Sequence, residues 1–142
     1  MIENHRLTTS LRSNPATSES KLYDGFPASM RSTMFTLLGP GKIAGVPIVF
    51  TDKARETSTI IFHMGPSLAG YPGVVHGGVL AMLLDEGLAT CLMRVAPGRI
   101  PVTMNLNIQF RRPAPTGELY ATKARVVSMA DDVVRVDGQL RY

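Results

Sequence analysis

The spacing of apolar residues changes along the chain, and these changes separate predicted strands from predicted helices. Between residues 100 and 111, apolar and polar positions alternate, which predicts a strand with one buried face. Other short apolar runs are bounded by turn residues, and they predict strands over residues 43–50, 55–64, 119–129 and 133–142. Residues 27–38 begin at a proline and carry apolar residues at helical spacing, so we expect a short helix there.

Residues 76–93 are apolar on nearly every side, which predicts a buried central helix. A turn rich in glycine and proline, residues 70–73, precedes this helix, and Ala96-Pro97-Gly98 ends it. The order is therefore two strands, a long helix and three strands. This order predicts an α+β fold, in which one antiparallel sheet wraps around one helix.

The first 25 residues differ in composition from the rest of the chain. They are polar, rich in serine, threonine and asparagine, and show little periodicity, so we expect residues 1–25 to form a flexible arm. Residues 26–142 then form a single domain. Arg6 and Arg12 are typical of a mitochondrial leader, whereas Glu3 and Glu19 argue against one. We therefore expect a cytoplasmic protein, with a mitochondrial location as the alternative.

Composition and charge exclude several classes of function. The net charge of +4 is mild, and no basic patch interleaved with aromatic residues suggests nucleic-acid binding. No apolar run is long enough to span a membrane. The lone Cys91 lies on the apolar helix, where a thiol stays protonated and is a poor nucleophile. Neither an H-E-x-x-H motif nor a cysteine cluster is present, so we expect no metal site.

Two carboxylates, Asp85 and Glu86, lie in the middle of the predicted apolar helix. An unpaired buried carboxylate costs several kcal/mol, so one of them is expected to have a partner or a chemical role. At helical spacing, Asp85 shares its face mainly with small residues, whereas bulkier residues surround Glu86. Asp85 is therefore the better candidate for a functional group. The alternative is an ordinary carboxylate with no role in chemistry.

The predicted helix begins with His76-Gly77-Gly78, which places exposed backbone N–H groups at its first turn. Such an end suits a phosphate, a carboxylate or a developing oxyanion. His76 has the alternative role of a helix cap. Gly77 and Asp85 are about 12 Å apart along one helix, so both reach one reacting carbonyl only if they come from different chains. A two-fold dimer with antiparallel helices would bring them together.

Several motifs together resemble the hotdog-fold acyl-CoA thioesterases, in the branch of PaaI-like and thioesterase-superfamily proteins. They are His76-Gly77-Gly78, Leu84-Asp85-Glu86, the segment 103–108 and Arg112-Pro113. The resemblance covers residues 39–142 and implies a hotdog fold. Hotdog chains of this branch carry one more strand after residues 139–142, so the last strand is expected to be missing and the domain to be C-terminally incomplete. Relatives also often carry Asn or Gln where this chain has Gly70.

The resemblance implies an enzyme that hydrolyses acyl-CoA thioesters, needs no cofactor and acts as a homodimer or homotetramer. The N–H of Gly77 would polarise the thioester carbonyl, beside His76 and Gly78 at the helix start. Asp85 would act as base or nucleophile, and Thr103 would orient the attacking water or Asp85. Apolar and cationic residues would hold the acyl group and coenzyme A, and the candidates are Met82, Leu88, Arg111 and Arg112.

Two other functions stay open from the sequence. A binding or regulatory hotdog protein would hold acyl-CoA in the apolar pocket without needing Asp85. A hotdog hydratase or dehydratase would pair an aspartate with a nearby histidine, but His76 and Asp85 of one chain are too far apart for that pairing. Loss of turnover on changing Asp85 to asparagine would separate the thioesterase from the binding protein.

Overall fold

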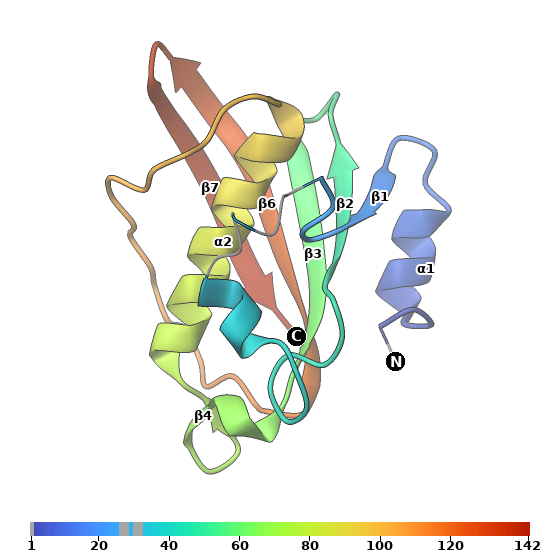
Figure 1. Ribbon diagram of the computed structural model, residues 1–142, viewed down its shortest axis with the longest axis vertical. Coiled ribbons are helices and arrows are strands. Elements are labelled where there is room, and N and C mark those ends of the chain that lie inside the picture. Colours follow the sequence, from blue (N-terminus) through green and yellow to red (C-terminus); the bar gives the residue numbers. More distant parts are fainter. Residues whose placement is uncertain (1, 26–28, 30–32) are drawn as a thin grey trace.

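The computed structural model describes residues 2–25, 29 and 33–142. Its main feature is a five-stranded sheet in which every neighbouring pair is antiparallel. In spatial order the strands are β1 (Ser18–Lys21), β2 (Ile48–Asp52), β3 (Thr57–Met64), β6 (Glu118–Ala130) and β7 (Val133–Arg141). The long helix α2 (Gly77–Val95) lies across one face of this sheet (Figure 1). This arrangement confirms the predicted α+β fold.

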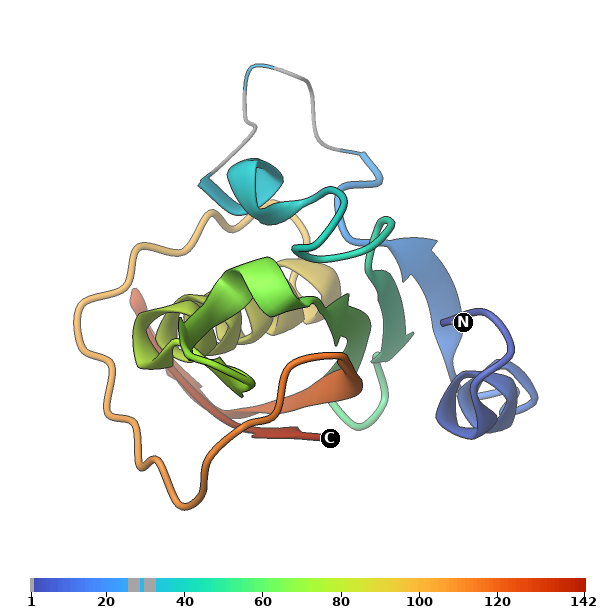
Figure 2. The same cartoon turned by 90° about the horizontal axis from the view of Figure 1, so that it is seen from below.

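Helix α2 packs against β3, β6 and β7 of the sheet. Its sheet-facing side is buried, with Leu83 3% exposed and Cys91 fully buried. At Gly87 the helix approaches β6 so closely that an added Cβ would lie 2.5 Å from Thr122 Cγ2. A side chain at this position would therefore push the helix away from the sheet. Figure 2 shows the sheet curving around the helix.

The opposite side of α2 has less cover than the sequence predicts. Ala81 and Ala89 on this side are only partly buried, although an apolar helix is normally surrounded by protein. The sheet covers one side of the helix, and in the described part of the chain the extended segment 99–113 runs past its other side (Figures 1 and 2). Such incompletely covered apolar surface is typical of a site that contacts another protein or a ligand.

Residues 2–25 are folded in the structure, unlike the flexible arm that their composition suggests. Helix α1 (Arg6–Arg12) packs Leu7 and Leu11 against a cluster on the outer face of the sheet, and β1 pairs with β2. The Arg12 guanidinium binds Glu3 Oε2 at 2.7 Å and Glu19 Oε1 at 2.6 Å. The two leucines fall in a polar stretch too short to show helical periodicity, so their packing was not visible in the sequence.

The strand predicted over residues 100–111 is wrong for this structure. The segment is extended, but no backbone–backbone hydrogen bond is found for residues 100–113 within the described chain. Its apolar residues, expected to be buried, are open to solvent: Ile100 is 73%, Val102 84% and Met104 86% exposed. The segment still has one polar face, and Thr103 on that face contacts α2. A strand also needs a partner, and none of the described strands lies beside this segment.

Most other elements follow the predictions. The strands expected over residues 55–64, 119–129 and 133–142 are confirmed as β3, β6 and β7, with shifts of one or two residues at their ends. The strand expected from residue 43 begins only at Ile48, because Pro47 lacks a ladder donor. Thr33–Leu37 form a 3-10 helix, whereas Pro27 and most of the first half of the predicted helix lie outside the described residues.

Two short strands lead into the central helix. They are β4 (Ala69–Tyr71) and β5 (Val74–Val75), which form a hairpin turning at Gly73, where φ is +78°. A left-handed φ of this kind favours glycine. The hairpin fixes the direction in which the chain enters α2. Among the described residues, no helix combines the length and the apolar character needed to cross a membrane.

Candidate functional site

The start of α2 is organised by His76, which is the N-cap residue of the helix. Its ring nitrogen Nδ1 accepts a hydrogen bond of 2.9 Å from the backbone N–H of Gly78. Its carbonyl oxygen accepts from the N–H groups of Val79 at 2.9 Å and Leu80 at 3.1 Å. Three of the first four N–H groups of the helix are therefore bonded. This contact is the capping alternative that the sequence left open for His76.

The remaining N–H group of this turn belongs to Gly77, and it has no hydrogen-bond acceptor among the described residues. Gly77 is exposed, and an added Cβ would lie 3.9 Å from the Phe110 ring, at ordinary contact distance. The N–H is thus a free donor at the positive end of a helix dipole, beside an aromatic ring. This combination suits an incoming carbonyl oxygen that acquires negative charge.

A second pair of predicted residues, Asp85 and Thr103, meets in the middle of α2. Thr103 Oγ1 donates a hydrogen bond of 2.7 Å to Asp85 Oδ1. Asp85 is half-buried on the helix, and Thr103 lies on the extended segment that passes it. The hydrogen bond holds one carboxylate oxygen and leaves the other for a water molecule or a substrate. A carboxylate fixed in this way has the geometry of a base or a nucleophile.

Glu86 points into a different environment from Asp85. Together with apolar residues that include Met34, Phe62 and Leu83, it lines a small cavity of about 10 Å³ in the core. Burial, and then the neighbouring charge of Asp85, raise the pKa of the Glu86 carboxyl above its usual range. Glu86 therefore faces the protein interior, while Asp85 faces the segment that carries Thr103.

The raised pKa of Glu86 gives a testable pH dependence of stability. Ionising this carboxyl costs more free energy in the folded protein than in the unfolded one. The stabilising contribution of protonated Glu86 is therefore fully present below the ordinary pKa of 4.5, and it is lost as pH rises through the raised pKa of the folded state. We expect Glu86→Gln to melt close to the wild type at pH 4 and at a higher temperature than the wild type at pH 7. Thermal unfolding followed by circular dichroism at both values tests this, and a melting-temperature difference independent of pH would contradict it.

The two halves of the candidate site are separated along one helix. Gly77 begins α2 and Asp85 lies in its middle, about 12 Å further along the axis. Within one chain, the structure therefore groups His76 and Gly78 with Gly77, and Thr103 with Asp85. It does not bring the two groups to one point.

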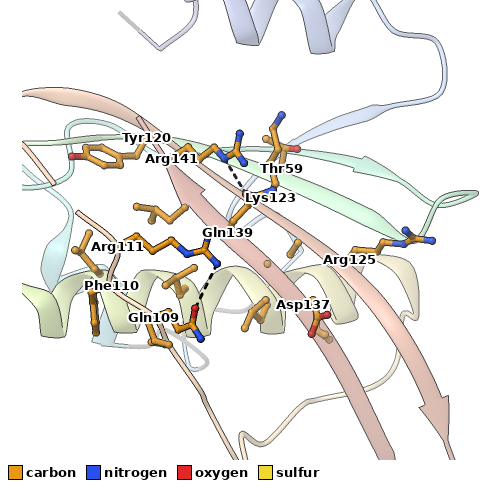
Figure 3. A pocket seen from close by; sticks show the side chains of 18 of the residues that line it. Thr59, Gln109, Phe110, Arg111, Tyr120, Lys123, Arg125, Asp137, Gln139 and Arg141 are labelled. Carbon is orange, nitrogen blue, oxygen red and sulfur yellow. Dashed lines mark hydrogen bonds between the residues drawn. The ribbon is translucent and has the colours of Figure 1, made fainter. Parts of the chain in front are cut away.

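The predicted substrate-binding residues fall into two places. Met82 packs against the main hydrophobic core. Leu88, Arg111 and Arg112 line a cavity of about 1170 Å³ between α2, β7 and the segment 106–112 (Figure 3). Adjacent residues on an extended chain point in opposite directions, and the two arginines have different neighbours: Arg112 lies over the Tyr142 ring, 4.6 Å from its centroid, and Arg111 contacts Gln109.

Gly70, where relatives often carry a larger polar residue, packs directly against the helix start. An added Cβ at Gly70 would lie 3.1 Å from both Cα and Cδ2 of His76. A side chain here would displace the residue that caps α2. The absence of an amide at this position therefore fits the local packing of this chain.

The sequence reasoning missed Phe110 and the cavity that it lines. Phe110 is 58% exposed and its ring is the nearest neighbour of a Cβ placed on Gly77. In the sequence Phe110 counted only as the last apolar residue of an alternating strand. No local pattern could place it beside Gly77, because their proximity depends on the path of segment 99–113 around α2.

The described side chains form no group of three His, Cys, Asp or Glu residues that could hold a metal ion. The lone Cys91 is buried against the sheet, and burial raises the pKa of its thiol. The groups available for chemistry at the candidate site are therefore a free backbone N–H, a half-buried carboxylate and a hydroxyl.

A model of the thioesterase superfamily matches residues 72–141, which include the start of α2, Asp85 and Thr103. Acyl-coenzyme A thioesterase THEM4 of Bos taurus is 37% identical over 67% of this chain and 41% of its own length. A Candida albicans protein named as mitochondrial is 32% identical over 73% of this chain and 47% of its own length. The chain spans less than half the length of the first curated relatives it matches.

A solved structure supports the same relationship at the level of the fold. The phenylacetic acid degradation-related protein of Ralstonia eutropha superposes with a TM-score of 0.62. It is 25% identical, and the match covers 81% of this chain and 83% of that one. The sheet and the central helix of the present structure are therefore shared with a protein of similar size.

Proposed function

Because the chain belongs to the thioesterase superfamily and has the hotdog fold, we propose that it hydrolyses acyl-coenzyme A thioesters to a free acid and coenzyme A. The observation that carries the proposal is the hydrogen bond of 2.7 Å from Thr103 to Asp85. It joins two residues, distant in sequence, that the motif pattern had assigned to one site. A carboxylate positioned by a hydroxyl is suited to activating water against a thioester.

Each group then has a defined task. The Gly77 N–H binds the thioester oxygen and stabilises the negative charge that develops on it. Asp85 either removes a proton from water as that water attacks the carbonyl carbon, or attacks the carbon itself. The carbon–sulfur bond breaks, and the leaving sulfur of coenzyme A takes up a proton that comes from the attacking water or from solvent. In the second route the acyl group is then bound to Asp85 as an anhydride, and water hydrolyses it to release the free acid and restore the carboxylate. His76 holds the helix start through its bond to Gly78, so it positions the donor.

The separation of Gly77 and Asp85 supports a site shared between two chains. About 12 Å along one helix is too far for both groups to contact one carbonyl. Two copies with their α2 helices side by side and antiparallel would bring Gly77 of one chain to Asp85 of the other. The half-covered side of α2 and the exposed Ile100, Val102 and Met104 supply apolar surface for such a contact. We therefore propose a homodimer or homotetramer as the active form.

Leu88, Arg111 and Arg112 lie at the cavity beside this proposed site. Leu88 offers an apolar wall to an acyl chain, and the two arginines offer positive charge to the phosphates of coenzyme A. The relative named as mitochondrial favours a mitochondrial location over the cytoplasmic one expected from composition. Import of a tagged chain into isolated mitochondria would distinguish the two locations.

The direct test is release of free thiol from a panel of acyl-CoA esters of different chain length, followed with a thiol reagent. We expect turnover on at least one length class, with no added metal or cofactor. Binding of acyl-CoA without thiol release at any chain length would favour the non-catalytic alternative. A calorimetric titration with the same esters separates that outcome from loss of binding.

Thr103→Val is expected to lower kcat about tenfold while changing KM little. The substitution keeps the side-chain shape but removes the hydroxyl that donates to Asp85, and a hydrogen bond to a charged group contributes on the order of 1.5–3 kcal/mol. Thr103→Ser keeps the donor and should retain most of the activity. Equal loss in the valine and serine variants would contradict a positioning role for the hydroxyl. Steady-state kinetics on the best substrate provide the measurement.

Mixing two inactive variants tests whether the site is shared between chains. Gly77→Pro removes the oxyanion donor, and Asp85→Asn removes the carboxylate. After dissociation and reassembly of an equal mixture, half of the dimers contain one chain of each kind and one intact site. We therefore expect about a quarter of wild-type activity from the mixture. No recovery, with mixed dimers confirmed by native mass spectrometry of differently tagged chains, would contradict the shared site.

A further inference from the structure

The imidazole ring of His76 is held in one orientation by two glycines. An added Cβ at Gly78 would lie 3.1 Å from Nδ1 and 3.2 Å from Cε1 of the ring, and an added Cβ at Gly70 would lie 3.1 Å from Cδ2. Both edges of the ring therefore pack against backbone, at positions where a side chain would crowd it. This packing, together with the hydrogen bond of 2.9 Å that Nδ1 accepts from the Gly78 N–H, fixes the ring before a substrate binds.

The same hydrogen bond determines which nitrogen of His76 carries the proton. A neutral imidazole has one N–H donor and one acceptor, and an Nδ1 that accepts from the Gly78 N–H has no proton of its own. The proton of neutral His76 is therefore on Nε2. His76 is exposed, and none of the described residues accepts a hydrogen bond from this Nε2–H group. Capping of α2 thus uses one ring nitrogen and leaves the other as a free donor.

This free donor lies at the same end of α2 as the free N–H of Gly77. Nδ1 is bound to Gly78, the residue after Gly77, so the ring lies against the first turn of the helix. Nε2 is the ring atom between Cε1 and Cδ2, so it points outward between the two glycines that hold the ring. One backbone donor and one side-chain donor, from adjacent residues, therefore meet at the positive end of the helix dipole.

We propose that the Nε2–H of His76 is a second hydrogen-bond donor to the thioester oxygen, beside the N–H of Gly77. This role depends on the proposed thioester hydrolysis and makes His76 a catalytic residue as well as a helix cap. A carbonyl oxygen accepts both bonds because it has two lone pairs. Neutral histidine is suited to this task because it offers an N–H to the developing charge. A donor that packing has already fixed needs no rearrangement as that charge develops.

His76→Ser and His76→Gln separate the two roles of this residue. Serine is a good N-cap residue and accepts from the Gly78 N–H, but it has no donor at the position of Nε2. Glutamine carries an amide N–H at about the reach of Nε2, but it is not among the favoured N-cap residues. We expect kcat of the serine variant to fall about 10²-fold while its melting temperature stays close to that of the wild type. The glutamine variant should melt at a lower temperature and yet be more active than the serine variant.

Two substrate analogues test the contact without turnover. An S-(2-oxoalkyl)-coenzyme A carries a ketone oxygen near the place of the thioester oxygen, whereas the matching S-alkyl-coenzyme A has no carbonyl. In calorimetric titrations, His76→Ser should weaken binding of the ketone about three- to tenfold, the usual contribution of one hydrogen bond, and leave binding of the thioether unchanged. His5→Ser is the matched control, because the Nδ1 of His5 caps α1 in the same way by accepting from the Leu7 N–H. It should leave binding of both analogues and kcat unchanged.

The proposal is overturned if activity follows melting temperature, with the glutamine variant less active than the serine variant, because His76 would then act only as a cap. Equal weakening of both analogues by His76→Ser would place the contact on coenzyme A instead of the carbonyl oxygen. Unchanged binding of both would exclude the contact. Absence of thiol release from the wild type would reject the proposed hydrolysis. Selective weakening of the ketone would in that case still place the Nε2–H at a carbonyl oxygen, and its absence would reject both proposals.

Discussion

Asp85→Asn is expected to lower the rate of thiol release by about 10²- to 10⁴-fold, which is the usual contribution of a positioned general base. Asparagine has nearly the shape of aspartate and still accepts the hydrogen bond from Thr103, which is 2.7 Å long in the wild type. It cannot take a proton from water at neutral pH, nor attack the carbonyl as a carboxylate does. The loss should therefore fall on kcat, with KM nearly unchanged. Steady-state kinetics with the best acyl-CoA substrate measure both.

Glu86→Gln is the matched control for this variant. It removes one negative charge from the adjacent position of the same helix, but Glu86 faces the small core cavity instead of Thr103. We expect this control to keep activity close to that of the wild type. Similar losses in both variants would indicate a general effect of charge on α2. Full activity in Asp85→Asn with loss in Glu86→Gln would transfer the catalytic role to Glu86. Gel filtration and circular dichroism should confirm that both variants keep their assembly and fold.

The central helix was predictable because its signals are local. The glycine–proline turn, the glycine pair after His76 and the long apolar run locate α2 to within a residue or two. The choice of Asp85 over Glu86 also followed from helical spacing, since small residues share a face with Asp85. The structure adds the contact partner of each carboxylate, which depends on how distant segments pack. The role of each residue in catalysis stays a prediction for the kinetics to test.

The segment 100–111 shows why a local pattern is not sufficient. Its alternation correctly indicates an extended chain with one polar face, and Thr103 on that face contacts α2. The pattern cannot say whether a neighbouring strand is available, because pairing depends on residues elsewhere in the sequence. The opposite error occurred at Leu7 and Leu11, where two apolar residues in a polar stretch pack against the sheet. In both cases the deciding contact is non-local.

Gly77→Pro is expected to lower kcat by about 10²- to 10³-fold, because it removes one backbone donor from the proposed oxyanion site. Proline is well tolerated at the first position of a helix, where its ring fits the backbone and no helical hydrogen bond is lost. The residue before a proline must be extended, and His76 already is, with φ −61° and ψ 132°. The Gly77 N–H has no acceptor among the described residues, so the folded chain loses no internal bond.

Gly77→Ala separates the loss of the donor from the gain of a side chain. Alanine keeps the N–H, and its Cβ would lie 3.9 Å from the Phe110 ring, at ordinary contact distance. We expect the alanine variant to keep most of its activity and the proline variant to lose nearly all of it, with similar melting temperatures. Equal activity in the two variants would exclude the Gly77 N–H as the oxyanion donor. Because proline removes only this N–H, such a result would direct attention to the remaining exposed donors near Asp85, beginning with the hydroxyl of Thr103.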